Sequence, residues 1–134
     1  MIGDQIATIE GPVKNSMMPA QGASPVFESS FNGAGHIVDV GVQSLATYTS
    51  VMNIDGTLYG ECPNQGLLMA QDGVATFRAT GVGKFTDTGG SSFRGAVYFQ
   101  ASAASLSDLN GKCFVYHWEV DAEGAATWNI WHWE

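Results

Sequence analysis

Residues 74–101, VATFRATGVGKFTDTGGSSFRGAVYFQA, decide the fold class. Two runs rich in β-branched and aromatic residues flank the glycine-containing stretch Thr86–Ser91, which predicts two antiparallel strands joined by a loop. Pairing the runs across this loop gives one face that carries Phe77, Ala79, Gly81, Gly83, Phe85, Phe93, Gly95, Val97 and Phe99. Rings that alternate with glycine and alanine suit the interior of a small, tapering barrel. Arg78 and Arg94 fall on the other face, so we expect both to point outward.

Three turn dipeptides extend this pattern along the chain: Asn32-Gly33, Asp55-Gly56 and Asp72-Gly73. Both residue pairs tolerate the positive φ angles of a type I′ turn, so each dipeptide predicts a two-residue hairpin loop. The expected strands are Ile2–Val13, Val26–Phe31, Gly35–Gln43, Ala46–Ile54, Thr57–Ala70, Val74–Phe85, Phe93–Ala101, Cys113–Val120 and Ala125–Trp133. Asn15–Pro25 is interpreted as a connection or an edge. Pro63 and Gly66 predict a bulge or an edge within the fifth strand.

The strand count leaves two architectures, a closed up-and-down barrel and a sandwich. Glycines inside strands favour the barrel, because they permit sharp bends and close packing. Only Ser102–Asn110 could be helical, and it would form one or two turns. We therefore predict an all-β protein: a single antiparallel up-and-down β-barrel of about eight strands, in one domain spanning residues 1–134.

Composition limits the classes of function. The net charge is −8 with five cations, too few and too scattered for a nucleic-acid or anionic-membrane surface. Charged residues make up 13% of the chain, about half the usual share, which suggests that an oligomer hides part of the surface. The N-terminal residues do not resemble a signal peptide and no apolar run approaches a membrane span, so we expect a cytoplasmic protein. Cys62 and Cys113 are then expected as reduced thiols, with a disulfide as the alternative.

The candidate site follows from the register of the Asp55-Gly56 turn. A two-residue loop there places Met52 opposite Tyr59 and Ser50 opposite Glu61, with Tyr48 on the same face. Tyr48, Met52, Tyr59 and Glu61 are thus the predicted ligand-binding residues. A carboxylate in an apolar pocket has a raised pKa, so Glu61 is the predicted catalytic acid or base, and Tyr59 could orient a substrate oxygen. The alternative for Glu61 is a carboxylate at the rim of the barrel.

Signatures of other chemistry are missing from the sequence. His36, His117 and His132 lack the spacing of metal ligands, and no nucleophile elbow is present. Gly81-Val82-Gly83 lies within a strand and lacks the continuation of a phosphate-binding loop. Cys113 follows Lys112 but is interpreted as a structural thiol. We expect neither a cofactor nor a metal.

The C-terminal hairpin contains all four tryptophans. Phe114, Tyr116 and Trp118 alternate with a second apolar set, and Trp128 alternates with Trp131 and Trp133. Both faces are apolar or aromatic, so we expect one face to fill the barrel. The other is expected to meet a partner subunit or the Met17–Pro25 segment, and this hairpin is the predicted homo-oligomer contact.

Three stretches in the middle of the chain carry a resemblance: Tyr59-Gly60-Glu61, Gly81-Val82-Gly83-Lys84-Phe85-Thr86 and Gly89-Gly90-Ser91-Ser92-Phe93-Arg94-Gly95-Ala96. Together they resemble the small eight-stranded barrels of the allene oxide cyclase-like superfamily. The resemblance covers about 40 residues. It implies a barrel with a cavity for hydrophobic molecules, often in an oligomer, but no catalytic motif can be matched residue by residue.

These observations support three hypotheses. The leading one is a barrel that binds a hydrophobic or aromatic small molecule in its interior. The second is a cofactor-free cyclase or isomerase that uses an acidic residue in the cavity. The third is a structural or interaction module whose barrel is filled by its own side chains.

Overall fold

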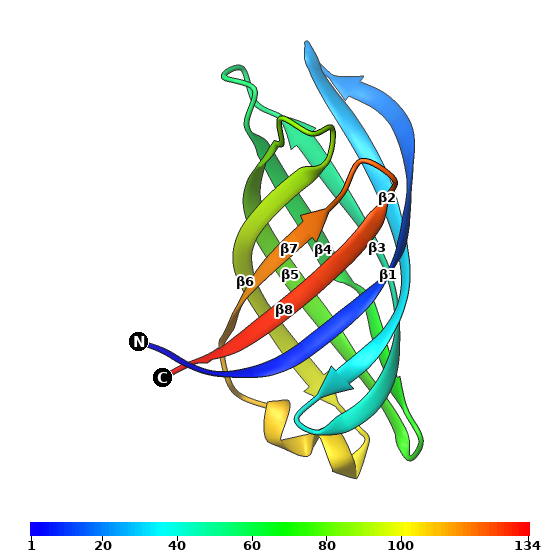
Figure 1. Ribbon diagram of the computed structural model, residues 1–134, viewed down its shortest axis with the longest axis vertical. Helices are drawn as coiled ribbons and strands as arrows, with labels where there is room; N and C mark the ends of the chain where they lie inside the picture. The colour runs from blue at the N-terminus through cyan, green and yellow to red at the C-terminus, as the bar shows by residue number, and fades with distance from the viewer.

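The computed structural model describes residues 1–134, apart from the side chain of Gln65, and its strands form one closed antiparallel barrel (Figure 1). The eight strands are β1 (Ile2–Gln21), β2 (Ser24–Ile37), β3 (Val40–Met52), β4 (Leu58–Ala70), β5 (Gly73–Phe85), β6 (Ser91–Ala101), β7 (Phe114–Val120) and β8 (Ala125–Trp133). Each strand pairs with its neighbours in sequence, and β8 closes the ring on β1. The predicted up-and-down barrel is confirmed.

The β5–β6 hairpin has the predicted register. Phe77 lies opposite Phe99 and Gly81 opposite Gly95, and Phe93 is buried on the same inner face. A Cβ atom on Gly81 would lie 2.5 Å from the Tyr116 hydroxyl oxygen, so glycine here makes room for a ring from β7. Arg78 and Arg94 are exposed on the outer face, as predicted.

The prediction of a turn at Asn32-Gly33 was wrong. Both residues lie inside β2, where Gly33 pairs with Ser44. A Cβ atom on Gly33 would overlap the ring of Phe31, so this glycine serves close packing. The chain reverses instead at Val38 and Asp39, whose φ angles are 45° and 65°, values typical of a type I′ turn.

The register predicted at Asp55-Gly56 was wrong by one residue. Met52 pairs with Leu58, and the Asn53 backbone N–H donates to the Thr57 oxygen over 2.8 Å, so the loop contains three residues, Ile54–Gly56, with Gly56 at a φ of 86°. The Asp55 carboxylate accepts hydrogen bonds from the Thr57 backbone N–H (3.0 Å) and hydroxyl (2.6 Å), which stabilises the longer loop. A one-residue slip moves every side chain of a strand to the opposite face. Tyr59 and Glu61 therefore lie on the outer face.

The turn predicted at Asp72-Gly73 also lies elsewhere in the structure, but the same side chains face the interior. Ala70 pairs with Gly73, so Gln71 and Asp72 form the loop. This differs from the predicted pairing by two residues, which preserves the alternation of faces. Asp72 accepts hydrogen bonds from the backbone N–H (2.9 Å) and hydroxyl (2.6 Å) of Ser105 at the start of the 3-10 helix.

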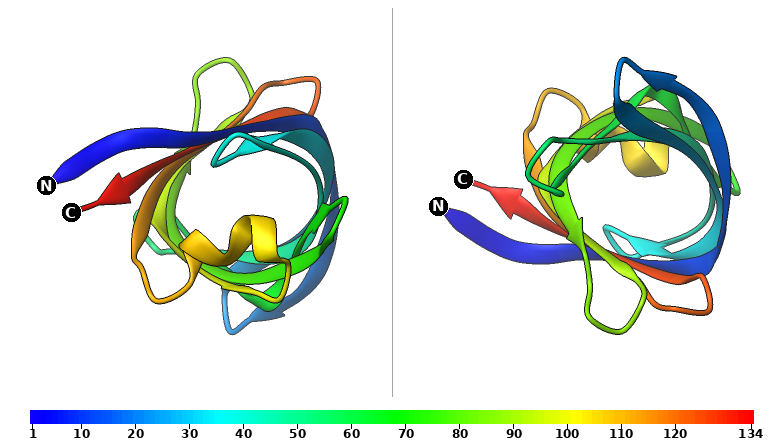
Figure 2. Two further views of the ribbon diagram at one scale, coloured as in Figure 1. Left: turned by 90° about the horizontal axis from the view of Figure 1, so that it is seen from below. Right: turned by 90° about the horizontal axis from the view of Figure 1, so that it is seen from above.

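In the part of the chain that the structure describes there is one helix, η1 (Ala104–Leu109), which falls within the predicted Ser102–Asn110 stretch. It lies at one opening of the ring of strands (Figure 2). Leu106 and Leu109 are fully buried, so this end of the barrel is closed by aliphatic side chains.

The segment Asn15–Pro25 is an edge, one of the two predicted alternatives. β1 continues to Gln21 and pairs with β2, for example Met17 with Phe27. Its pairing with β8 reaches only to Pro12, so the last part of β1 has one open side. This arm extends beyond the barrel at the top of Figure 1. The predicted bulge in β4 is also confirmed, between Cys62 and Gly66.

Candidate functional site

A cavity of about 50 Å³ lies inside the barrel. Its lining is mainly aromatic, with small residues between the rings. The lining residues are Phe31, Ala46, Tyr48, Gly60, Glu61, Cys62, Phe77, Ala79, Phe93, Tyr116, Trp118 and Trp128. They come from every strand except β1, so the closed ring itself brings the site together.

The aromatic rings around this space are packed edge to face or tilted against one another. Phe31 and Trp118 have ring centroids 4.8 Å apart at 88°, and Phe77 lies 4.9 Å from Trp128. Trp118 and Trp128 meet at 6.2 Å and 84°. Such contacts fix ring orientation. On the β7–β8 side, the cavity is therefore lined by rings whose orientation is fixed by their neighbours.

Tyr48 is the polar centre of the site. Its hydroxyl oxygen accepts a hydrogen bond of 3.1 Å from the indole N–H of Trp118. Burial raises the pKa of Tyr48, and hydrogen bonds with Trp118 and Ser29 oppose the rise only in part. Ser29 in turn donates to Asn15 over 2.6 Å. The phenol is therefore protonated at neutral pH and can donate its O–H.

Two further polar side chains border the cavity. The Tyr116 hydroxyl donates to the backbone oxygen of Thr80 over 3.1 Å, and burial strongly raises its pKa. The Cys62 thiol donates to the backbone oxygen of Thr47 over 3.3 Å. Cys62 is buried in β4 while Cys113 is half-buried directly before β7, and the two form no disulfide with each other. Tyr116 and Cys62 already donate to the backbone, whereas among the described residues the Tyr48 O–H has only the Ser29 hydroxyl as its partner, so Tyr48 is the best candidate donor for a ligand that takes the place of Ser29.

The structure separates the four residues predicted to bind a ligand. Tyr48 lines the cavity and Met52 is half-buried against the core on the same inner face of β3. Tyr59 is 40% exposed, and Glu61 borders the cavity although its side chain is exposed. Gly60 and Cys62, which flank Glu61, are buried instead. The predicted inward facing of Tyr59 and Glu61 was wrong, and their catalytic roles stay predictions without support from this geometry.

No carboxylate is buried among the side chains that the structure describes. The interior thus offers two tyrosines and a thiol as its titratable groups, and burial favours the neutral form of each phenol. Such a site can bind and orient a molecule through an O–H donor. Within the same described residues, no three His, Cys, Asp or Glu side chains are grouped to hold a metal ion.

The cavity reaches the wall where β4 leaves its neighbours. Pairing with β3 is regular up to Ala46–Gly66 and resumes only at Thr49–Glu61, and pairing with β5 is interrupted next to Cys62. Tyr48 lies within the gap in β3. The bulge therefore lies beside the polar centre of the site.

The predicted site omitted most of the residues that line the cavity. Phe77 and Phe93 were placed correctly inside the barrel, and Trp118 and Trp128 were assigned to the C-terminal hairpin without a facing. The structure buries Phe114, Tyr116, Trp118, Trp128 and Ile130 on the inner face. The alternation of residues in the two strands was the signal for this facing. Trp118 and Trp128 pair directly across the hairpin, so they and the residues two positions away from each lie on the same face.

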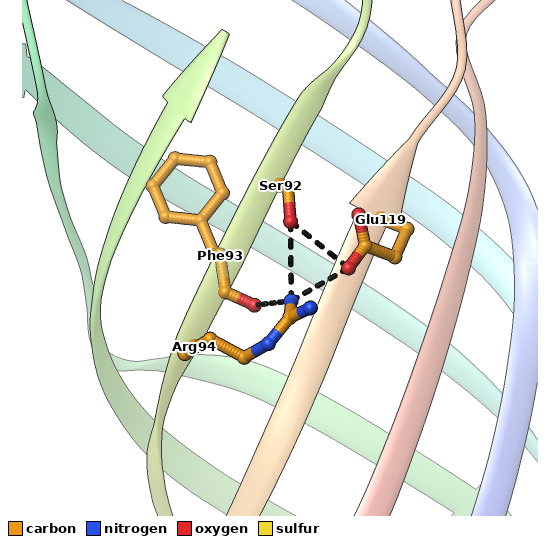
Figure 3. Close-up of polar contacts among 4 residues, drawn as sticks. All are labelled: Ser92, Phe93, Arg94 and Glu119. Atoms are coloured by element: carbon orange, nitrogen blue, oxygen red, sulfur yellow. Dashed lines mark hydrogen bonds and ion pairs between the residues drawn. The ribbon is translucent and has the colours of Figure 1, made fainter. Parts of the chain in front are cut away.

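Outside the barrel, a polar cluster joins β6 to β7 (Figure 3). Arg94 forms an ion pair of 2.6 Å with Glu119 and also donates to the Phe93 backbone oxygen over 3.0 Å. Ser92 accepts from Arg94 and donates to Glu119. Both ionic side chains are about half exposed, so the pair adds little stability.

Comparison with known proteins finds no matching family model and no matching curated protein. Solved structures do match. A conserved protein of unknown function from Rhodopseudomonas palustris has a TM-score of 0.80 at 12% identity, covering 98% of this chain and 97% of that one. A protein of unknown function from Clostridium acetobutylicum has a TM-score of 0.75 at 12% identity, covering 97% and 98%.

A third match is a β-barrel-like protein from Acinetobacter baumannii, with a TM-score of 0.78 at 13% identity, covering 98% of this chain and 94% of that one. At such low identity these similarities establish the barrel fold alone. Within the part of the chain that the structure describes, no helix is long and apolar enough to cross a membrane.

Proposed function

We propose that this barrel binds one small, mainly apolar molecule that accepts a hydrogen bond from Tyr48. The observation that carries the proposal is the cavity itself, which leaves space beside a buried phenol in an aromatic core. Apolar walls with few polar groups are the usual composition of small-molecule sites. The resemblance of the mid-chain segments to allene oxide cyclase-like barrels agrees with this function.

The volume limits the ligand. Sites for drug-sized molecules usually measure about 300–1,000 Å³, whereas this cavity measures about 50 Å³. One water-sized group needs about 10–15 Å³, so the cavity accepts a molecule of roughly four non-hydrogen atoms. A small ketone fits the size, the apolar walls and the donor. An aromatic ligand would require the rings to move apart.

Affinity must be modest. The best small ligands gain about 1.5 kcal/mol per non-hydrogen atom. Four atoms then give about 6 kcal/mol at most, and a dissociation constant no tighter than tens of micromolar. The same small volume favours the rival hypothesis of a filled structural barrel, so the test must separate the two.

The test is an NMR titration with acetone, a ketone of four non-hydrogen atoms, that follows the indole N–H signal of Trp118. We expect saturable shifts in the millimolar range at Trp118 and Tyr48. Ala79→Leu should abolish them, because Ala79 lines the cavity and the longer side chain fills it. Ala34→Leu is the matched control, since Ala34 is exposed on β2.

Tyr48→Phe should weaken binding about tenfold by removing the donor, in line with a hydrogen bond of about 1.4 kcal/mol. Unsaturable shifts in the wild type, or equal shifts in Ala79→Leu and Ala34→Leu, would show a filled barrel without a ligand site.

A further inference from the structure

We propose that the outer face of β6, β7 and β8 is the interface of a two-fold symmetric homodimer. We call this surface the tryptophan face and define it by Tyr98, Cys113, Val115, Trp131 and Trp133, with Ile2 of β1 at its border. The strands that carry it lie next to one another on one side of the barrel (Figure 1). The proposal concerns the outside of the barrel and is independent of the cavity.

The tryptophan face is built from adjacent cross-strand rows. Ala96 pairs with Val115, and Val115 pairs with Trp131. In the next row, the Trp133 backbone N–H donates to the Cys113 oxygen, and Ile2 pairs with Trp133. These residues therefore form one continuous apolar surface across neighbouring strands.

The large side chains of this surface remain in water. Tyr98, Trp133 and Ile2 are 50%, 53% and 59% exposed. Trp131 packs against His117 with ring centroids 4.7 Å apart and an interplanar angle of 58°, which holds its indole against the barrel wall. Exposed aromatic clusters of this kind are typical of protein interfaces, where tryptophan and tyrosine supply much of the binding energy. The Met17–Pro25 segment, predicted as an alternative cover, lies in the β1–β2 arm and leaves Trp133 exposed.

Charges on the two sides of the tryptophan face have opposite sign. Arg78 pairs with Tyr98 on the β5–β6 side, and Lys112 precedes Cys113. On the β8–β1 side lie the exposed carboxylates of Asp4 and Glu134, which outnumber the Met1 ammonium group that donates to the Glu134 backbone oxygen over 2.6 Å. Neither Arg78 nor Lys112 forms an ion pair with any residue that the structure describes.

This arrangement is complementary to itself. A two-fold axis along β7 places the β8–β1 side of one copy over the β5–β6 side of the other, as in any isologous contact. The cations Arg78 and Lys112 of each copy then face the carboxylates on the β8–β1 side of the other copy. This contact occurs twice, once on each side of the axis. Because each copy carries a net charge of −8, two copies repel unless they meet at a face where this repulsion is relieved. A second copy is therefore the partner that fits best.

The shape of the same region agrees. An open depression of about 550 Å³ lies on the β5–β6 side, bordered by Asn64, Arg78, Tyr98, Gln100 and Asn110. The proposed axis brings Trp133 of the second copy to this depression. There its indole would pack on Tyr98 and beside the Arg78 guanidinium, an arrangement that favours cation–π attraction.

The first experiment measures the dimer dissociation constant by sedimentation equilibrium. We expect a micromolar dimer in the wild type and at least about 30-fold weaker association in Trp133→Asp. Val82→Asp is the matched control, since Val82 is 61% exposed on β5 outside the tryptophan face. A monomeric wild type, or a dimer weakened by Val82→Asp and not by Trp133→Asp, would overturn the proposal. Circular dichroism checks that both variants fold.

The second experiment reverses the charges. The pair R78E/K112E and the pair D4K/E134K should each weaken the dimer about tenfold or more, because each brings like charges together. The quadruple variant combines both pairs and should restore association to within about threefold of the wild type. If the quadruple variant is no tighter than either double variant, the two charged sides do not meet and the proposed symmetry is wrong.

Discussion

The β5–β6 and β3–β4 hairpins share one barrel wall, yet their inner faces differ. β5 and β6 pair without interruption from Ala75–Ala101 to Phe85–Ser91, and the side chains that they bury are apolar. The inner face of β3 and β4 includes Ser44, Ser50, Tyr48 and Cys62, and pairing breaks beside Tyr48. Polar groups and the cavity thus accompany irregular pairing, while regular pairing accompanies close apolar packing.

The largest effect should come from the packed side. Phe77→Ala removes a buried ring that contacts Trp128, so we expect a loss of about 3–5 kcal/mol in unfolding free energy, measured by urea denaturation. A Cβ atom on Gly66 would overlap the Phe77 ring. Gly66→Ala should therefore destabilise the wild type more than it destabilises Phe77→Ala. Strictly additive effects of the two substitutions would contradict this packing.

A pair of glycine substitutions compares the two hairpins directly. On Gly95, a Cβ atom would overlap the Thr80 backbone oxygen, whereas on Gly60 it would lie 3.1 Å from the side-chain ring of Phe93. We expect Gly95→Ala to cost about 3 kcal/mol and Gly60→Ala about 1 kcal/mol, because a backbone cannot move aside as a ring can. Equal thermal denaturation midpoints for the two variants would show that the two hairpins accommodate an added methyl group equally well, which would contradict this comparison.

A smaller effect is expected at the polar centre. Tyr48→Phe leaves the Trp118 indole N–H without its acceptor, at a cost of about 1–2 kcal/mol in unfolding free energy. Amide hydrogen exchange should rise mainly in β3 and β7. Unchanged stability would mean that the Trp118–Tyr48 hydrogen bond contributes nothing net.

The smallest effect is expected at His117, on the outer face of β7 beside Arg94 of β6. Burial and the nearby Arg94 lower the pKa of His117, with Glu119 opposing them. The unfolded chain therefore binds a proton more readily than the folded protein. The stability that His117 contributes is complete above its ordinary pKa of about 6.5 and declines as the pH falls through the folded pKa. His117→Gln should reduce this acid sensitivity slightly in denaturation curves between neutral and mildly acid pH.

Much of the fold was predictable because alternation and glycine content report on packing. The β5–β6 hairpin was placed correctly since its five-residue loop and its alternating rings agree on one register. The C-terminal hairpin and the short helix were found for similar local reasons.

The candidate site was predicted less well, because turn dipeptides do not fix loop length. Asp55-Gly56 serves a two-residue and a three-residue loop equally, and side-chain hydrogen bonds to Thr57 favour the longer one. That single residue moved Tyr59 and Glu61 outward. Asn32-Gly33 misled for another reason, since the glycine is required by the ring of Phe31 and not by a turn. Contacts between distant strands cannot be inferred from local patterns.

The most direct test of the contrast between the two hairpins is a crystal structure determined under xenon pressure, because xenon enters apolar cavities. The account predicts a xenon atom inside the barrel between Tyr48, Ala79 and Trp118, which line the cavity. It also predicts that Ala79→Leu removes this atom while Ala34→Leu retains it. A barrel interior without xenon, in crystals that bind it elsewhere, would contradict the central claim that the β3–β4 side encloses an accessible apolar site.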